Sequence, residues 1–387
     1  MAAVIADPRQ TVVVPDTPDT EKSSSTVHTM TFAAPTGREG SWRFSPLRRL
    51  RPLLTDAPSD AHLTWDTTLP DGVELVPVDA DDPALDAVPD PVDHISELAR
   101  RHSDGAVVVR VPKAAELTEP VVIRLSGTNP EALVWGHIVV EVGEHAQARV
   151  ILDHSGTARY AANVSVLVGD GASLDLVHVQ DWTDASLHAA HVATRVGRDA
   201  RYKSMQVSLG GSVVRIVETV TFDGPGGDAE LNGLYFADAG QHLEHRLFIE
   251  HQEPNCRSRV SYKGALQGAS ARTVWVGDVF IGATAEGTDT YEINRNLVLS
   301  EGAHADSIPN LEIETGQIIG AGHASATGRF DDEQLFYLRS RGIPADEARR
   351  LVVRGFFADL IGRMGEPELQ ERLMVRIEAR LAAAGVL

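Results

Sequence analysis

Residues 164–172, VSVLVGDGA, and residues 192–200, VATRVGRDA, decide the fold of this chain. The two segments align residue by residue, so that Val164 matches Val192. A third copy, IVVEVGEHA, occupies residues 138–146. In each copy, a run of alternating apolar residues leads to a glycine, two further residues and an alanine. Such a repeat predicts coils that stack on one another, because a single coil cannot bury its apolar face alone.

The glycines of these turns recur at nearly constant spacing. Gly143, Gly169 and Gly197 are 26 and 28 residues apart. The same kind of turn recurs further along the chain, at Gly226, Gly240, Gly268, Gly282 and Gly302. We expect each glycine to supply a positive φ and the small residue after it to let successive turns stack. A unit near 14 residues, doubled to near 28, predicts a parallel β-helix with two long strands in each coil. An antiparallel sandwich also has short strands and glycine turns, but it gives no reason for a conserved register.

The chain divides into four predicted regions around this core. Residues 1–34 are rich in Pro, Thr, Ser and Asp and are expected to be disordered. Residues 35–104 are predicted to be irregular and partly helical, with a docking segment around Trp42. The β-helix is expected over residues 105–328. Residues 329–387 show apolar residues every three or four positions, which indicates a helical C-terminal domain. The predicted fold class is therefore mainly β with a helical tail.

Charge and composition exclude several classes of partner. The 387-residue chain has a net charge of −20, which argues against nucleic acid or an anionic membrane as a partner. No window is apolar over the 18 or more residues of a membrane span, and the first residues do not form a signal peptide. The single cysteine, Cys256, allows no disulfide within the chain. These features predict a cytoplasmic protein.

Two groups of residues could carry enzymatic or metal chemistry, and neither is convincing. Glu286, Asp289 and Glu292 are close in sequence, as in a β-helix polysaccharide lyase or hydrolase, but we expect them to be solvated strand and turn residues. His242, His245 and His251 could bind a transition metal. Because side chains alternate along a strand, His242 and His245 would point to opposite faces. We therefore expect surface histidines, no metal site and no catalytic residue.

A cluster of iron and sulfur also needs more than this chain offers. A conventional cluster has four protein ligands, mostly thiolates, and Cys256 is the sole thiol. Cys256 is expected to pack as a small hydrophobe on a strand. The isolated chain is therefore expected to bind no stable cofactor. His323, between a glycine and an alanine, would ordinarily be a turn residue.

The end of the predicted β-helix and its helical tail resemble a known family. The segments PNLEI at 309–313, GHASATGRFDDEQLFYLRSRGI at 322–343 and ARRLVVRGFFADLI at 348–361 are similar to the core of the SufB/SufD proteins. Fainter similarity extends to 251–266 and to SWRFSPL at 41–47. The short length and near absence of cysteine resemble SufD more than SufB. These proteins are non-enzymatic subunits of the SUF iron–sulfur cluster assembly system.

The resemblance implies a fold, partners and a site. The fold would be a right-handed parallel β-helix. The partners would be a SufB-like paralogue, in a heterodimer, and a SufC-like ABC-type ATPase, and a homodimer in isolation remains open. His323 would lie at the interface where a transient cluster, shared with the SufB-like partner, is assembled. Here the segment reads Ala321-Gly322-His323-Ala324, without the cysteine that the SufD pattern has two positions earlier.

The helical tail is implied to dock the ATPase. The residues expected to carry this contact are Arg341, Gly342, Ala348, Val352 and Phe356. Two alternatives to a SufD-like scaffold remain open from the residues alone. One is the lyase or hydrolase with the acidic residues above, and the other is a homomeric β-solenoid adhesin, which should carry a secretion signal.

Overall fold

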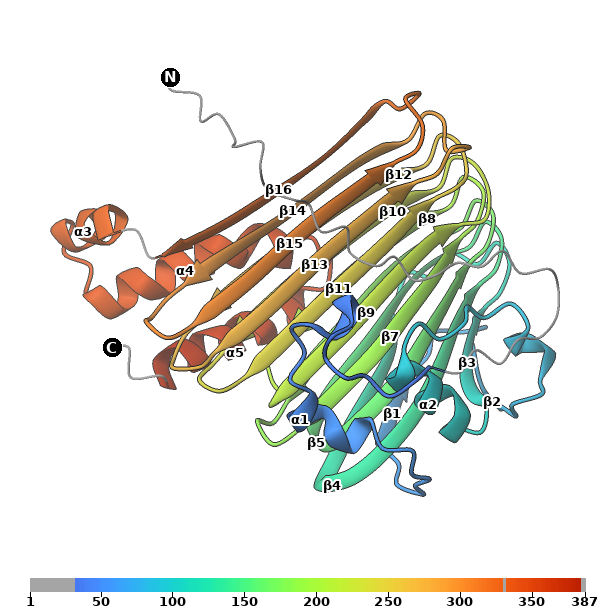
Figure 1. Cartoon of the computed structure of the whole chain (residues 1–387), viewed down its shortest axis with the longest axis horizontal. Coiled ribbons are helices and arrows are strands. Elements are labelled where there is room, and N and C mark those ends of the chain that lie inside the picture. Colours follow the sequence, from blue (N-terminus) through green and yellow to red (C-terminus); the bar gives the residue numbers. More distant parts are fainter. Residues whose placement is uncertain (1–31, 330–331, 384–387) are drawn as a thin grey trace.

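The computed structural model describes residues 32–329 and 332–383, so that most of the tail predicted over 1–34 lies outside the described part. Its body is a parallel β-helix with helices on two opposite outer faces (Figure 1). Among the described residues, no helix is both long and apolar enough to cross a membrane.

The β-helix consists of two sheets that diverge from one bent strand. The first two coil strands are 22 residues long and are β4 (Val121–Val142) and β5 (Gln147–Val168). The even-numbered strands that follow are β6 (Ser173–Trp182), β8 (Arg201–Ser208), β10 (Asp228–Ala237), β12 (Arg257–Leu266), β14 (Asp289–Val298) and β16 (Gly320–Arg329). The odd-numbered strands are β7 (Leu187–Val196), β9 (Val213–Phe222), β11 (His242–His251), β13 (Arg272–Ile281) and β15 (His304–Ile313). Each coil thus contributes one strand to each sheet, and neighbouring coils pair in parallel.

The register read from the repeat is confirmed. Val164 of β5 pairs with Val192 of β7, and Val168 pairs with Val196. Val142 of β4 pairs with Val168 in the same way. These pairings are parallel, which rules out the antiparallel sandwich. The alanine that ends each repeat is fully buried, as stacking of the turns requires.

The positive φ expected at every turn glycine is confirmed at four positions and wrong at the other four. It is found at Gly226, Gly240, Gly268 and Gly302 and is absent at Gly282. Gly143, Gly169 and Gly197 do not have a positive φ; in the last turn the positive φ falls two residues later, at Asp199. A Cβ on Gly169 would lie 2.8 Å from the backbone nitrogen of Glu144 in the coil below. No real side chain tolerates such a contact, so these glycines allow adjacent turns to approach closely.

An N-terminal layer covers the outer face of the odd-numbered sheet. Its helices are η1 (Gly40–Trp42), α1 (Leu47–Leu50), η2 (Arg51–Leu53), η3 (Pro83–Leu85) and α2 (His94–His102). Buried Leu50 and Leu98 pack there against Trp135 and Ala189. Three further strands extend the first coil. β1 (Thr64–Thr68) pairs antiparallel with β4, and β2 (Glu74–Val78) pairs antiparallel with β3 (Ala106–Val111), which in turn pairs parallel with β4.

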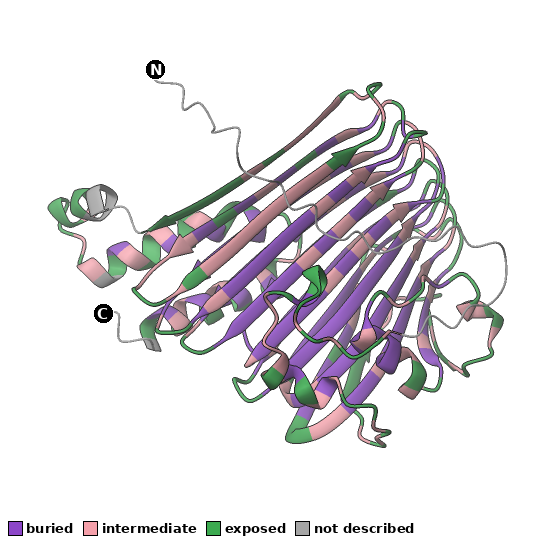
Figure 2. Ribbon diagram, viewed as in Figure 1, coloured by how far each residue is buried: buried purple, intermediate pink, exposed green. Residues whose placement is uncertain are grey.

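The C-terminal helices cover the outer face of the even-numbered sheet. They are α3 (Asp332–Ser340), α4 (Ala345–Gly362) and α5 (Pro367–Ala383). Phe357 of α4 and Leu373 of α5 pack against Val207 and Leu234 of the sheet. The apolar periodicity expected in the tail is confirmed on α5, where four residues spaced by four are all buried: Leu369, Leu373, Ile377 and Leu381. Burial falls away over the last coil, where β15 and β16 form the least covered edge of the body (Figure 2).

Candidate functional site at the open end of the β-helix

The last coil leaves the β-helix open at one end. β16 pairs only with β14, and β15 pairs only with β13, among the strands of the described chain. The outer edge of each strand therefore presents backbone N–H and C=O groups that no further strand satisfies. Inside this coil, Ser325 of β16 meets Ser307 of β15, with 2.8 Å between their hydroxyl oxygens. A partner chain can approach this end.

His323 lies on this open coil and points inward. It occupies the position of β16 that pairs with Glu292 of β14. Its side chain is 44% exposed, and its Nδ1 lies 3.9 Å from Oε1 of Glu292, just outside hydrogen-bond range. The imidazole is therefore open to solvent on one side and faces a carboxyl group on the other.

Glu292 is the unusual group of the site. Its side chain is 2% exposed, and neither carboxyl oxygen has a hydrogen-bond partner. Burial, together with the nearby charge of Asp278, raises the pKa of Glu292 from its ordinary value of 4.5 to about 8. A Cβ on Gly277 would lie 2.3 Å from Oε2, so the carboxyl occupies the space that this glycine leaves. At neutral pH the group is mostly protonated and can give a proton to a bound ligand.

Behind this pair, the interior of the last coils is polar. Tyr235 donates its hydroxyl to Oδ1 of Asn296 at 2.8 Å and accepts from Nδ2 of Asn294 at 2.9 Å. Asn296 in turn donates to Thr327 of β16 at 3.4 Å. These hydrogen bonds satisfy the buried amides, whereas Glu292 has none. The two carboxyl oxygens of Glu292, beside His323, therefore differ from these amides in having no partner.

The three carboxylates that suggested a lyase or hydrolase do not form a site. Glu286 is exposed, Asp289 pairs with Arg259, and Glu292 is buried inside the coil. The expectation that Glu292 is solvated is wrong, because period-two alternation places it on the same inner side as Asn294. Two-carboxylate glycosidases need both groups on one substrate, and this geometry does not provide that.

The histidines predicted at the surface are buried. His242, His245 and His251 are each no more than 3% exposed. As alternation predicted, His242 and His245 point to opposite sides: His245 contacts the interior Ser208, and His242 contacts Glu244 beneath the N-terminal layer. The expectation of surface histidines is wrong because the N-terminal layer and the coil interior cover them.

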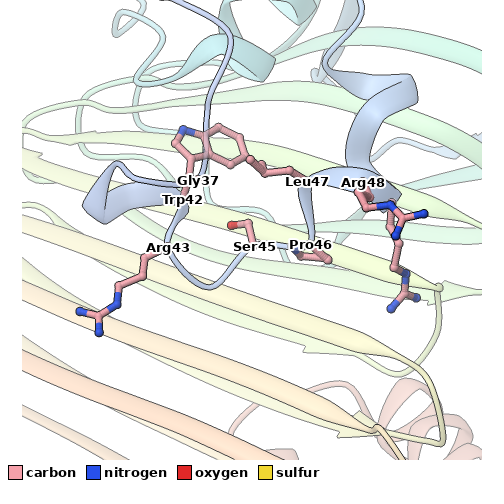
Figure 3. Close-up of a pocket in the computed structure, with 8 residues that line it drawn as sticks. Gly37, Trp42, Arg43, Ser45, Pro46, Leu47 and Arg48 are labelled. Carbon is pink, nitrogen blue, oxygen red and sulfur yellow. The ribbon is translucent and has the colours of Figure 1, made fainter.

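The N-terminal layer is held by a buried ion cluster around Glu244. Arg246 and Ser45 hydrogen-bond to this carboxylate at 2.6 and 2.8 Å, and Arg215 lies 3.9 Å from the ring of Trp42. Burial alone would raise the pKa of Glu244, but the hydrogen bond from His242 and the two arginines hold it far below its ordinary value. In the same layer, Trp42, Arg43, Arg48 and Arg49 are among the residues that line an open hollow of about 630 Å³ (Figure 3). This layer is firmly attached to the β-helix and lies on different strands from His323.

Cys256 does not reach the candidate site. It lies in the turn before β12 rather than on a strand, is 1% exposed, and packs in the core. Burial raises the pKa of its thiol. In the strand register, His323 of β16 pairs with Glu292 of β14, and Glu292 pairs with Val260 of β12. Val260 lies four residues beyond Cys256 in the sequence. The thiol and the imidazole are therefore not brought together.

The residues expected to dock the ATPase differ in exposure. Arg341 and Gly342 are exposed after α3, but Ala348 is fully buried and Val352 is half-buried. Phe356 is half-buried, and its carbonyl accepts a hydrogen bond from Lys263 of β12 at 2.8 Å. The exposed apolar residues of this region are others, namely Phe336, Tyr337 and Leu351.

Comparisons with known proteins agree on the family. Residues 124–356 match the family model described as "SUF system FeS cluster assembly, SufBD core domain". An iron-sulfur cluster assembly SufBD family protein of Mycobacterium tuberculosis is 51% identical over 357 residues, covering 90% of each chain. A SufBD family protein of Mycobacterium leprae is 48% identical over 90% of this chain and 91% of its own length. The iron-sulfur cluster assembly protein SufD of Escherichia coli is more distant, at 29% identity over 62% of this chain and 58% of its own.

The match covers most of the β-helix, the open coil with His323 and Glu292, and the helical tail as far as Phe356. The resemblance drawn from the sequence is thereby confirmed, and this chain belongs to the SufBD family of SUF iron–sulfur cluster assembly proteins.

Proposed function

We propose that the chain is a non-catalytic, SufD-like scaffold subunit that builds an iron–sulfur assembly site together with a SufB-like paralogue. The supporting observation is the open last coil, which offers His323 beside an unpaired, mostly protonated carboxyl group. A neutral imidazole can ligate iron, and a carboxyl with a pKa near 8 can exchange a proton at neutral pH. The thiolates must come from the partner, because Cys256 is buried elsewhere.

The unpaired edges of β15 and β16 support a heterodimer through this end. An exposed strand edge pairs readily with a strand from another chain. A paralogue of the same fold would bring an equivalent edge, so that the two sheets could continue across the interface. The cluster would then form between the chains as cargo and leave with an acceptor.

The exposed apolar residues on α3 and α4 support a second contact, with an ABC-type ATPase. Phe336 and Tyr337 are 73% and 57% exposed, and Leu351 is 44% exposed. Large exposed apolar side chains close together are typical of binding surfaces. Arg341, whose guanidinium lies 5.2 Å from the ring of Tyr337, adds a charge to this surface.

The site proposal is tested in the complete complex. His323→Ala should leave the subunit composition unchanged, because loss of one half-exposed side chain rarely destabilises a fold. Iron and sulfide bound after anaerobic assembly should fall by roughly tenfold or more, as expected on removal of a metal ligand.

His304→Ala is the matched control, since His304 lies on β15 of the same open coil and is 67% exposed. It should retain the full yield of cluster. A wild-type yield from the His323→Ala complex, with all subunits present, would contradict the proposed role of His323.

A further inference from the structure

A cluster of three histidines lies inside the β-helix, several coils away from the open end. His154 is on β5, His178 on β6 and His188 on β7, and all three are fully buried. They meet where β5 bends from one sheet into the other, at Gly156 with its φ of +77°. One ring nitrogen from each histidine lies within 4.8 Å of those of the other two.

The nitrogens of these histidines lack the partners that buried polar groups normally have. Both ring nitrogens of His178 are without a hydrogen bond, and so are Nε2 of His154 and Nε2 of His188. An unsatisfied buried polar group destabilises the folded state. Four such atoms in one place indicate that something else satisfies them in the cell.

The hydrogen bond of His154 leaves a lone pair on its other ring nitrogen, which can bind a metal ion. Its Nδ1 lies 3.1 Å from the carbonyl oxygen of Val179. A carbonyl only accepts, so Nδ1 carries the proton and Nε2 keeps its lone pair. A backbone carbonyl on the far ring nitrogen is the usual outer contact of a metal-bound histidine.

His188 needs one rearrangement. Trp182 donates its indole N–H to Nδ1 of His188 at 3.1 Å, so that Nε2 carries the proton in the empty cluster. Binding a metal through either nitrogen breaks this bond, which is a single neutral hydrogen bond. Metal binding stabilises a folded site by much more than one such bond, so the exchange favours the metal.

We infer that His154, His178 and His188 form a binding site for one divalent first-row transition metal ion, Zn²⁺ or Fe²⁺. Three neutral imidazoles are a known ligand set for such ions, with water in the fourth position. At the 4.8 Å limit, the centre of the triangle is about 2.8 Å from each nitrogen, so the rings must close in to reach the usual 2.0–2.1 Å. The site is independent of the cluster assembly proposed at His323.

The test measures metal on the full chain, produced separately in medium with added Zn²⁺ and, without oxygen, in medium with added Fe²⁺. Wild-type protein should retain about one equivalent of one of these metals after desalting, with only nitrogen and oxygen neighbours in its X-ray absorption spectrum. His178→Leu should retain less than about a tenth of that.

The control His251→Leu replaces another fully buried interior histidine with one unsatisfied nitrogen. It should keep the metal. If His178→Leu does not fold, His178→Gln removes the imidazole while retaining a polar side chain. The inference would be overturned if the wild-type protein retained neither metal. It would also be overturned if the wild type and the His178 variant contained equal amounts of metal.

The melting temperature provides a second test, because a metal-bound cluster and an empty one predict changes in opposite directions for His178→Leu. If the cluster holds a metal, His178→Leu should lower the melting temperature, because the binding energy is lost. If the cluster is empty, the same substitution removes two unsatisfied nitrogens and should raise the melting temperature. A raised melting temperature would therefore count against the metal site even before any metal analysis.

Discussion

At the scale of the residue, Glu292 shows how the β-helix creates a reactive group from an ordinary one. Its carboxyl is inside the coil because alternation places it there, and it has no partner because Gly277 opposite offers only space. The protonated form is therefore favoured, and the pKa rises to about 8. The same burial sets the pH dependence of stability.

Glu292→Gln should remove part of that pH dependence. Because the pKa of Glu292 is raised on folding, its contribution to stability is fully present below pH 4.5 and is lost as pH rises through about 8. Wild-type protein should therefore lose about 1 kcal/mol per pH unit relative to Glu292→Gln between about pH 5 and pH 8. Urea unfolding across this range measures the difference.

Glu312→Gln on β15 is the control, because Glu312 is exposed at the same end of the molecule. It should follow the wild-type curve. If wild type and Glu292→Gln give parallel curves, Glu292 ionises normally in the folded protein and its role as a proton donor is lost.

At the scale of the element, α4 separates a buried face from an exposed one. Val353 and Phe357 pack against the β-helix, and Ala348 is also fully buried. Because Ala348 is buried, the stripe predicted to dock the ATPase includes a core residue, and Phe356→Asp would also remove the ring that lies 5.2 Å from Nζ of Lys263. Leu351 is a cleaner probe of docking, since it is 44% exposed on the same helix.

Leu351→Asp should abolish co-purification of the ABC-type ATPase with a tagged full chain from its own cell, because the charge would be buried without a partner. The melting temperature should change little, since the residue is exposed in the free chain. Val375→Asp on α5, where Val375 is 53% exposed, is the matched control and should retain the ATPase. Normal recovery of the ATPase with Leu351→Asp, identified by mass spectrometry, would exclude this surface.

At the scale of the whole molecule, the β-helix buries many titratable groups in neutral form. Burial lowers the pKa of seven histidines: His137, His154, His178, His188, His191, His245 and His251. Burial raises the pKa of Glu218 to about 7 and that of Glu292 to about 8. The histidines lower the stability of the fold as pH falls, whereas the two glutamates lower it as pH rises.

Stability should therefore pass through a maximum at about pH 7. A histidine with a lowered pKa contributes stability that is fully present well above about pH 6.5, the pKa of an unfolded histidine, and that is lost as pH falls toward about 4. Above about pH 7.5 the histidines contribute almost no slope, and the two glutamates lower stability as pH rises toward about 8. Melting temperatures measured at fixed ionic strength from acid to alkaline pH test this, and a maximum well above pH 8 would contradict it.

The sequence by itself determined the coil. Local periodicity predicts the pairing of Val164 with Val192, the stacked turns at Gly169 and Gly197, and the buried apolar residues of α5. The reason is that a repeating chain must bury its repeating face in the same way each time. It also determined that one thiol cannot hold a cluster alone.

Only the tertiary structure decided which polar residues are buried away from solvent. Alternation can place Glu292 on an inner face, but its raised pKa depends on what the opposite sheet leaves empty at Gly277. His178 and His188 belong to different sheets, and their meeting with His154 depends on how the two sheets face each other across the coil. The sequence repeat does not say which side chains of the two facing sheets meet across the interior of the coil. The burial of Glu292 and the meeting of the three histidines therefore could not be predicted from the sequence alone.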